Sequence, residues 1–362
     1  MGMVKKLLPI FTSLLIFNSC ATYVNVKIQK PASISLGNVK NVAVMDVADD
    51  EFIGSYSFTE VGDAPLSEKL ETILETIIEG KKKPKSPDLK NAYSGKTISD
   101  KIITSLVKNG HYSVVNRSML DKILNEQKLS MSGIVTDDNV TKIGEMLGVD
   151  AFLIGSGNYS VKDDGGWYKK KSNDKVYYYY KINRKIDVSI TYKIVSVETG
   201  QVIASLEKKK SKTLNAKGDD LETAFANLSN WQSTMDKLVN DILNKIIKQI
   251  APHYKKTSKL IKSGYSTGMK TGLQYAKRNM WEDAKDSWEQ VLKDHTPNGI
   301  KDRIPAIYNL GVYCEIKDNL DDAEELFDKC FNQSGKIEYL DARQRVQKRR
   351  KELEKLEKQI TN

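Results

Sequence analysis

Hydrophobic and polar positions recur most regularly between Thr97 and Gly157, and this stretch predicts the core of a folded domain. A helix is predicted to begin at Thr97 or Ser99, because either side chain can cap the first turn. Its apolar residues recur four apart, at Ile98, Ile102 and Leu106. Gly110 is expected to end this helix, and Tyr112–Val115 predicts a short strand after it.

Two further helices and a buried strand are predicted next. Ser118 and Asp121 resemble a capping box, and the apolar face of the helix that they open holds Leu120, Ile123 and Leu124. Asp137 or Asp138 is expected to cap the following helix, whose apolar face holds Val140, Ile143, Met146 and Leu147. Ala151–Ile154 is apolar at every position, as in a central strand covered on both faces. This alternation predicts an α/β layer in which helices bury a sheet.

A long strand with one solvent-facing side is predicted over Val176–Val197. Every second residue is apolar, and only Arg184 interrupts the series. The intervening positions are polar, at Lys181, Asn183, Lys185, Asp187, Ser189, Thr191 and Lys193. Gln201–Leu206 predicts the second strand of a hairpin, and Leu221–Ile250 predicts one long helix that covers the sheet.

These elements, in this order, resemble the CsgG family of bacterial lipoproteins, whose type member is the curli-secretion channel of the outer membrane. The resemblance rests on the opening strand Val42–Asp46, on Leu106–Gly133 (LVKNGHYSVVNRSMLDKILNEQKLSMSG) and on Ile143–Ser160 (IGEMLGVDAFLIGSGNYS). It extends more loosely through Ile186–Ser205 (IDVSITYKIVSVETGQVIAS). The resemblance implies a mixed α/β periplasmic domain over residues 38–252. It also implies a role in assembly or secretion and association into a homo-oligomeric ring.

The N-terminus predicts a lipid-anchored protein. Residues 1–19 contain an apolar run over 7–17 that is shorter than a membrane span and typical of a cleaved signal sequence. Cys20 follows a small residue and resembles a lipobox cysteine, which in bacterial lipoproteins is acylated, with palmitate as one expected chain, and becomes the mature N-terminus. Ala21 then favours the periplasmic face of the outer membrane, by resemblance to lipoprotein sorting. Residues 20–37 are interpreted as a lipidated tether; an ordinary signal peptide with an incidental cysteine is the alternative.

Residues 49–94 depart from the family pattern and are interpreted as an insertion. Within them a helical stripe of apolar residues is predicted, at Leu66, Leu70, Ile73, Leu74, Ile77 and Ile78. Packing against the parent domain is the favoured interpretation of this stripe. Contact with a partner or a neighbouring subunit is the alternative.

Membrane-spanning hairpins like those of the family's secretion channel are poorly supported. Val161–Gly166 is a poor spanning strand, and Glu207–Lys212 would place several lysines in lipid before a predicted helix. The sequence therefore favours a periplasmic domain without a pore. A curli-type secretion channel that forms an outer-membrane pore is the alternative, and a lipoprotein regulator of a cell-wall enzyme fits the same features.

Residues 264–335 contain two similar segments separated by 39 residues, and His253–Ser263 before them is interpreted as a basic linker. The recurring residues are Gly272, Tyr275, Ala284 and Trp288 in the first copy and Leu310, Gly311, Cys314, Ala323 and Phe327 in the second. The pattern resembles tetratricopeptide repeats, with residues 298–305 as an insert. This implies an all-α domain of helical hairpins with a groove that binds a partner protein. Residues 336–362 predict a polar capping helix.

Catalysis is not expected. The three histidines lie far apart without a metal-site or triad context, and we expect no cofactor and no metal. Gly155–Gly157 is interpreted as a bend, and Tyr177–Tyr180 as strand packing rather than a carbohydrate-stacking site. The net charge is +10, but the lysines are scattered among acids, so no nucleic-acid partner is expected. Cys314 and Cys330 are expected to be free thiols.

Overall fold

The structure, a computed structural model, describes residues 22–59, 65, 94–126, 137–173 and 175–361. Contacts divide the chain into two compact units. The first, called the repeat unit, contains residues up to Lys30 together with Tyr254–Glu357. The second, called the sheet unit, contains Pro31–His253 together with Lys358–Asn362.

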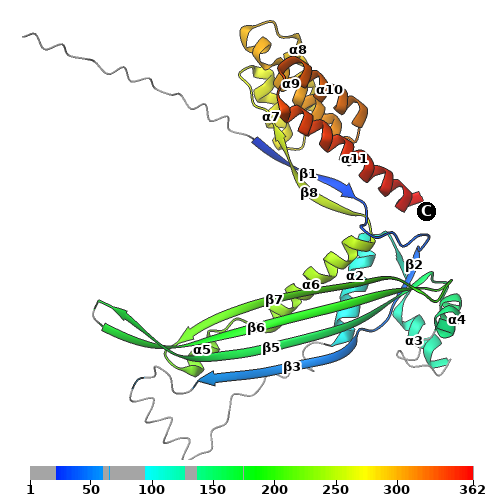
Figure 1. Ribbon diagram of the computed structural model, residues 1–362, viewed down its shortest axis with the longest axis vertical. Helices are drawn as coiled ribbons and strands as arrows, with labels where there is room; N and C mark the ends of the chain where they lie inside the picture. The colour runs from blue at the N-terminus through cyan, green and yellow to red at the C-terminus, as the bar shows by residue number, and fades with distance from the viewer. Residues whose placement is uncertain (1–21, 60–64, 66–93, 127–136, 174, 362) are drawn as a thin grey trace, which may run out of the picture. The chain divides into compact units, whose positions relative to one another are not determined.

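A six-stranded sheet forms the sheet unit, with strand order β4–β2–β5–β6–β7 and with β3 added beside β5. β2 and β3 run parallel to β5 along one of its sides, and β6 and β7 continue antiparallel on the other (Figure 1). The strands are β2 (Asn41–Val44), β3 (Ala48–Thr59), β4 (Ser113–Val114), β5 (Ala151–Ser172), β6 (Lys175–Ser196) and β7 (Val202–Gly218).

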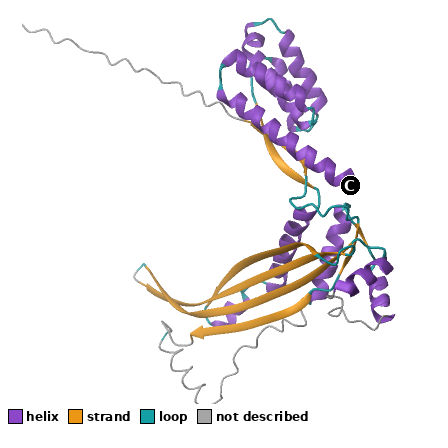
Figure 2. Cartoon of the chain, turned by 45° about the vertical axis from the view of Figure 1, so that its right-hand side comes forward, coloured by secondary structure: helices purple, strands orange, loops and turns teal. Residues whose placement is uncertain are grey.

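At its beginning, β5 is covered on both faces, as the apolar run over Ala151–Ile154 predicts (Figure 2). Leu153 packs with α2 and α6 on one face, and Phe152 packs with α3 and α4 on the other. The helices are α2 (Gly95–Asn109), α3 (Arg117–Glu126), α4 (Asp137–Leu147) and α6 (Trp231–Ile250). This root of the sheet confirms the predicted α/β class.

The helix caps differ from those predicted. Ser94, rather than Thr97 or Ser99, is the N-cap of α2 and accepts the Thr97 N–H at 3.3 Å. Ser99 is buried instead, and its hydroxyl accepts the Val47 N–H at 2.9 Å, which ties the helix to the segment between β2 and β3. At α3, Asn116 rather than Ser118 supplies the accepting oxygen.

β5 and β7 extend further than predicted. β5 continues through Val161–Gly166, which the sequence pattern disfavoured as a membrane-spanning strand, and β7 continues past the predicted end at Leu206 through Glu207–Lys212 to Gly218. Side chains along β5 alternate between buried and exposed, so most polar residues lie on the side that faces water. Charged residues within a segment therefore did not prevent it from forming a strand.

The predicted bend at Gly155–Gly157 is wrong, because these residues are part of β5. A Cβ atom at Gly155 would lie 2.8 Å from the ring of its cross-strand neighbour Tyr192. A Cβ atom at Gly157 would lie 2.0 Å from the Tyr159 hydroxyl. The glycines leave space for two tyrosine rings within a continuous strand.

The long helix predicted over Leu221–Ile250 is divided into α5 (Leu221–Ala226) and α6. Asn230 lies between them and starts α6 by accepting the Ser233 N–H at 3.1 Å. The apolar stripe of α6 packs on the sheet as predicted, with Met235, Val239, Ile242 and Ile246 fully buried.

In the repeat unit, a two-stranded sheet accompanies five helices. Residues 20–37 and 253–263 were interpreted as a tether and a linker, but β1 (Thr22–Lys30) and β8 (His253–Ile261) pair with each other. Val24 and Val26 alternate with polar residues and are buried, a strand pattern that the polar composition obscured. The helices are α7 (Thr267–Lys277), α8 (Trp281–Lys293), α9 (Pro297–Ile316), α10 (Leu320–Ser334) and α11 (Ile337–Thr361).

The remaining predictions about this part of the chain have mixed outcomes. The expected insert over residues 298–305 is part of α9, whereas the polar C-terminal helix is present as α11. β3 occupies the beginning of the predicted insertion, residues 49–94. The apolar helical stripe predicted over residues 66–78 of this insertion lies outside the described residues. None of the described helices is both long and apolar enough to cross a membrane.

Candidate functional site

Two helical hairpins, α7 with α8 and α9 with α10, form the body of the repeat unit. A Cβ atom at Gly272 would lie 2.3 Å from the indole nitrogen of Trp288, and one at Gly311 would lie 2.7 Å from the ring of Phe327. The chain thus uses a glycine twice, 39 residues apart, to let paired helices close on a buried ring. The other residues of the predicted signature are buried or half-buried in the same cluster: Tyr275, Ala284, Leu310, Cys314 and Ala323.

A segment of the same chain, residues 259–266, lies along α9. The backbone N–H of Lys262 donates to Asn309 Oδ1 at 2.8 Å, and Asn309 Nδ2 donates to the Lys262 carbonyl at 2.9 Å. Further along, Asp302 Oδ2 accepts the N–H groups of Tyr265 and Ser266 at 2.7 and 2.6 Å. Helix side chains therefore satisfy the backbone of an extended segment, as they would for a bound peptide.

A buried group of three charges holds the same segment. Lys259, from β8, forms an ion pair with Glu315 of α9, and Glu315 also accepts two parallel hydrogen bonds from Arg345 of α11, both at 2.9 Å. Burial alone would raise the pKa of Glu315, but the hydrogen bonds and charge of Arg345 outweigh it and leave that pKa below its ordinary value. This surface of α9 is thus occupied by the chain itself.

A groove on another side of the repeat unit is open, between α8, α9 and α10. Its floor is apolar, formed by Leu292, Leu310 and Leu326. Its rim carries both signs of charge, at Lys285, Glu289, Lys293, Asp322 and Glu325. Tyr313 borders the groove and donates a hydrogen bond to Glu282 at 2.6 Å, and burial raises the pKa of its hydroxyl to about 12. This groove is the candidate protein-binding surface of the repeat unit.

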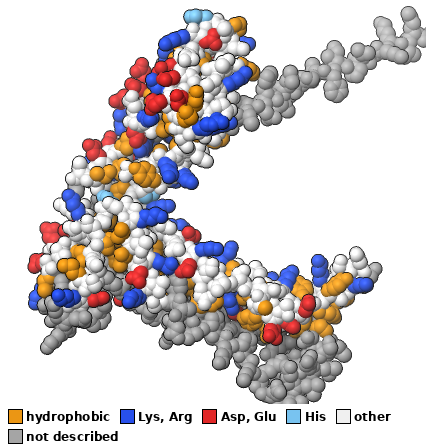
Figure 3. Space-filling view, turned by 180° about the vertical axis from the view of Figure 1, so that it is seen from behind, with side chains coloured by type: hydrophobic (Ala, Val, Ile, Leu, Met, Phe, Trp, Pro, Cys, Tyr) orange, Lys and Arg blue, Asp and Glu red, His pale blue; other side chains and the backbone are white. Residues whose placement is uncertain are grey.

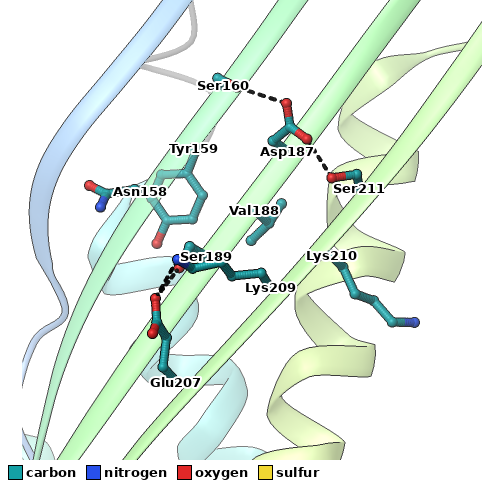
Figure 4. A pocket seen from close by; sticks show the side chains of 10 residues that line it. All are labelled: Asn158, Tyr159, Ser160, Asp187, Val188, Ser189, Glu207, Lys209, Lys210 and Ser211. Carbon is teal, nitrogen blue, oxygen red and sulfur yellow. Dashed lines mark hydrogen bonds and ion pairs between the residues drawn. The ribbon is translucent and has the colours of Figure 1, made fainter.

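The exposed side of the long sheet carries a second candidate site, a hollow of about 360 Å³ across β5, β6 and β7 (Figure 4). Asp187 lies at its centre and accepts hydrogen bonds from Ser160, at 3.3 Å, and from Ser211. Partial burial raises the pKa of Asp187, but its hydrogen bonds, of which that from Ser211 is the strongest, bring the pKa below its ordinary value.

The other carboxylate of the hollow is also held in its ionised form. Lys209 lies 2.8 Å from Glu207, and its hydrogen bond and charge lower the pKa of Glu207. General acid–base chemistry needs a group that titrates near neutral pH, and neither Asp187 nor Glu207 is shifted in that direction. The two carboxylates of the hollow are therefore suited to hydrogen bonding and ion pairing.

The covered side of the same strands holds a buried ion pair. Asp163 and Arg184 are direct cross-strand neighbours, joined by two hydrogen bonds of 2.7 Å. Arg184 is the residue that interrupts the apolar series of β6, and that interruption was the signal for a buried partner. The partner's position could not be derived, because the register of β5 against β6 was unknown.

The remaining candidate residues have simpler outcomes. Cys20 lies outside the described residues, so its lipidation stays a prediction. Cys314 and Cys330 are free thiols, as predicted. Within the described part of the chain, no group of His, Cys, Asp or Glu side chains could hold a metal ion. Sequence reasoning missed Asp302 and Asn309. Asn309 lies in a largely apolar run and could have been noticed, whereas Asp302 lies between Lys301 and Arg303 and carried no such signal.

Solved structures with a similar arrangement include the C-terminal domain of LpoB from Salmonella enterica, at 12% identity over 48% of this chain and 84% of that one, with a TM-score of 0.25. The PelC dodecamer from Paraburkholderia phytofirmans matches at 13% identity over 64% and 99%, with a TM-score of 0.26. Lipoprotein GNA1162 from Neisseria meningitidis matches at 12% identity over 57% and 97%, also at 0.26. No curated protein sequence matches this chain.

Family models describe both units. A model named domain of unknown function, DUF6340, matches residues 270–355, which contain most of the repeat helices. The model of the curli production assembly/transport component CsgG matches residues 78–270, more than half of the chain. This protein therefore belongs to the CsgG family.

Proposed function

We propose that this protein is a lipid-anchored scaffold on the periplasmic face of the outer membrane, where its sheet unit assembles into a ring and its repeat unit binds a partner protein. The family membership supports a role in assembly or transport. The open groove between α8, α9 and α10 supports partner binding, because its apolar floor and charged rim match the anatomy of protein interfaces.

The observation that carries the ring proposal is the difference between two outer strands of the sheet, β3 and β7. Among the described residues, β3 pairs only with β5 and β7 pairs only with β6, so each has one free side. β3 contains three consecutive acids, Asp49–Glu51, and β7 contains five lysines. Two unlike edges favour head-to-tail contacts, which form a closed ring when the rotation between neighbouring copies closes on itself.

The opposite charges also lie at the same level of the sheet. Asp49 pairs with Gly157, Gly157 pairs with Ile190, and Ile190 pairs with Lys208. In a head-to-tail contact between copies, the acidic part of one edge would meet the basic part of the next. The same charges would disfavour contact between two identical edges.

Exchanging these charges tests the ring. The chain that begins at residue 21 keeps every described residue and can be weighed in solution by native mass spectrometry. We expect Lys208→Glu to raise the concentration needed for half-assembly about tenfold, because it replaces attraction by repulsion at every junction. Asp49→Lys should have a similar effect, and the double variant should regain most of the assembly.

Lys212→Glu is the matched control. Lys212 lies on the same strand, but the residue at its level on β3 is Gly54, reached through Ile186 and Val161. Equal losses in Lys208→Glu and Lys212→Glu, or a double variant no better than the single ones, would contradict pairing between these edges.

The lipid anchor is tested separately. Intact-mass analysis of the protein extracted from membranes should find a chain that begins at Cys20 and carries acyl groups. Cys20→Ala should release the protein from an outer-membrane fraction that has been washed at high salt. A protein that retains residues 1–19 and lacks acyl groups would overturn the anchor and leave the ring proposal unaffected.

A further inference from the structure

The hairpin between β5 and β6 projects beyond the other strands of the sheet. β3 ends opposite Gly166 of β5, and β7 ends opposite Tyr180 of β6. The described residues between these points, 168–173 and 175–179, therefore pair only with each other. This projecting part of the hairpin is called the tip ribbon (Figure 1).

The base of the tip ribbon is firmly packed. Trp167 and Tyr180 are cross-strand neighbours in edge-to-face contact, with ring centroids 5.5 Å apart. They form a buried cluster with Ile182 and Ala224, the latter from α5. The ribbon is therefore held in a fixed direction from its base, and its outer residues do not take part in the core.

Large apolar side chains remain exposed on the tip ribbon. Tyr177 and Val176 are each 51% exposed, and Tyr178 is 40% exposed. The prediction that the run Tyr177–Tyr180 reflects strand packing holds only for its inner end, where Tyr180 is buried. Lysines accompany them at Lys169, Lys170, Lys171 and Lys175, and Figure 3 shows basic and hydrophobic side chains together at this end of the sheet.

The exposed residues occupy both faces of the ribbon. Successive strand residues point to opposite faces, so Tyr177 lies on one face and Tyr178 and Val176 lie on the other. Lysines on an isolated ribbon are common, because they prevent its edges from pairing with other strands. Exposed tyrosine and valine side chains do not have this effect and instead indicate a surface that makes contacts. A two-stranded ribbon of this kind needs surroundings that accept apolar side chains on both faces.

We infer that the tip ribbon docks on an anionic phospholipid surface, with Tyr177, Tyr178 and Val176 at the level of the head groups. A fluid interface can surround both faces of the ribbon, whereas a protein groove of fixed shape covers one. Tyrosine is favoured at membrane interfaces, because its ring is apolar and its hydroxyl is polar. The lysines match the charge of anionic head groups. This contact is independent of acylation at Cys20 and goes beyond the proposed scaffold function.

Vesicle flotation tests the inference with residues 21–362, which lack the predicted signal and the cysteine. We expect this chain to float with vesicles of phosphatidylglycerol and phosphatidylethanolamine, to bind phosphatidylcholine vesicles at least tenfold less, and to dissociate as salt rises. The double variant Tyr177→Ser/Tyr178→Ser should lower the bound fraction at least tenfold. Tyr254→Ser is the matched control, because Tyr254 is 68% exposed and lies in the repeat unit.

A spectroscopic readout places the contact. After subtraction of the signal of the four native tryptophans, the fluorescence of a Tyr178→Trp variant should shift to shorter wavelength on anionic vesicles and should be quenched by brominated acyl chains, whereas Tyr254→Trp should do neither. The inference is overturned if residues 21–362 do not float, if the serine variants float like the parent, or if the ribbon binds only when another protein is added. Because these experiments use an unacylated chain, their failure is separate from a failure of the proposed lipid anchor.

Discussion

The two units of this protein differ in whether a segment of the same chain covers a surface that could bind a partner. In the repeat unit, residues 259–266 occupy α9 through Asn309 and Asp302. In the sheet unit, β3 and β7 each have one side without a paired strand among the described residues, and the tip ribbon projects beyond both. The groove between α8, α9 and α10 remains open while this surface of α9 is filled, so a repeat pattern alone does not show which surface can accept a peptide.

The buried ion pairs of the two units also differ in how many elements they join. The repeat unit joins three elements through Lys259, Glu315 and Arg345, whereas the sheet unit joins two neighbouring strands through Asp163 and Arg184. Removing one member of a buried ion pair costs about 3–5 kcal/mol, because the charge left behind has lost its partner. The following predictions use this difference, in order of decreasing effect.

Glu315→Gln is expected to have the largest effect. It leaves two cations, Lys259 and Arg345, without their shared carboxylate and should destabilise the repeat unit by about 4 kcal/mol. Hydrogen exchange read by mass spectrometry should show faster exchange in β8 and α9 and no change in β5–β7. Asp241→Asn, which breaks an exposed pair with Lys210, is the control and should cost less than about 1 kcal/mol. Equal changes in both units would contradict the division of the chain.

Asp163→Asn should destabilise the sheet unit by about 3 kcal/mol, because Arg184 would remain buried with a neutral partner. The double variant Asp163→Leu/Arg184→Leu should recover most of this loss, since it removes both charges and adds apolar side chains on the covered face. Urea unfolding measures both values. If the double variant is less stable than Asp163→Asn, the ion pair stabilises the fold more than two packed leucines do, and this prediction is wrong.

Gly272→Ala should cost about 2 kcal/mol, because the added methyl group meets the indole of Trp288 in a packed interior. Gly311→Ala should cost a similar amount or slightly less, because the corresponding distance to Phe327 is longer. Thermal unfolding of the repeat unit measures the difference. Gly37→Ala is not a suitable control, since its backbone is left-handed, whereas the exposed Thr271→Ala is.

A change of pH in the range near neutral is expected to have the smallest effect on the free energy of unfolding. The pKa of Glu315 is lowered in the folded state, so its stabilising contribution is complete above the unfolded pKa of about 4.3 and is lost as pH falls through the lower folded pKa. Between pH 7 and about 5, we expect this group to change stability by less than about 0.5 kcal/mol. Below that range the wild type should lose more stability than Glu315→Gln. Parallel curves for the two proteins would show that Glu315 does not titrate with the fold.

Particular residues explain how far the sequence could predict the fold. Ala151–Ile154 was identified as a central strand because both of its faces are apolar, and the 3.6-residue stripe of α6 identified its buried face. The extensions of β5 and β7 were missed, because these segments are rich in lysines and aspartates. Which of their side chains face the covered side of the sheet becomes clear only when the register with the neighbouring strands is known. β1 was missed for a related reason: its buried valines lie in a polar segment, and its partner is more than 200 residues away.

By itself, the sequence determined the α/β and helical classes, the family resemblance, the polar side of the long strand and the repeated spacing of small and aromatic residues. Those features depend on local periodicity, which can be recognised from residues that are close together along the chain. Only the tertiary structure decided that Arg184 faces Asp163, that α9 holds a segment of its own chain, and that the hairpin of β5 and β6 outruns its neighbours. Each of these depends on which distant residues lie at the same level, and strand register and helix docking are set by the packing of the whole unit.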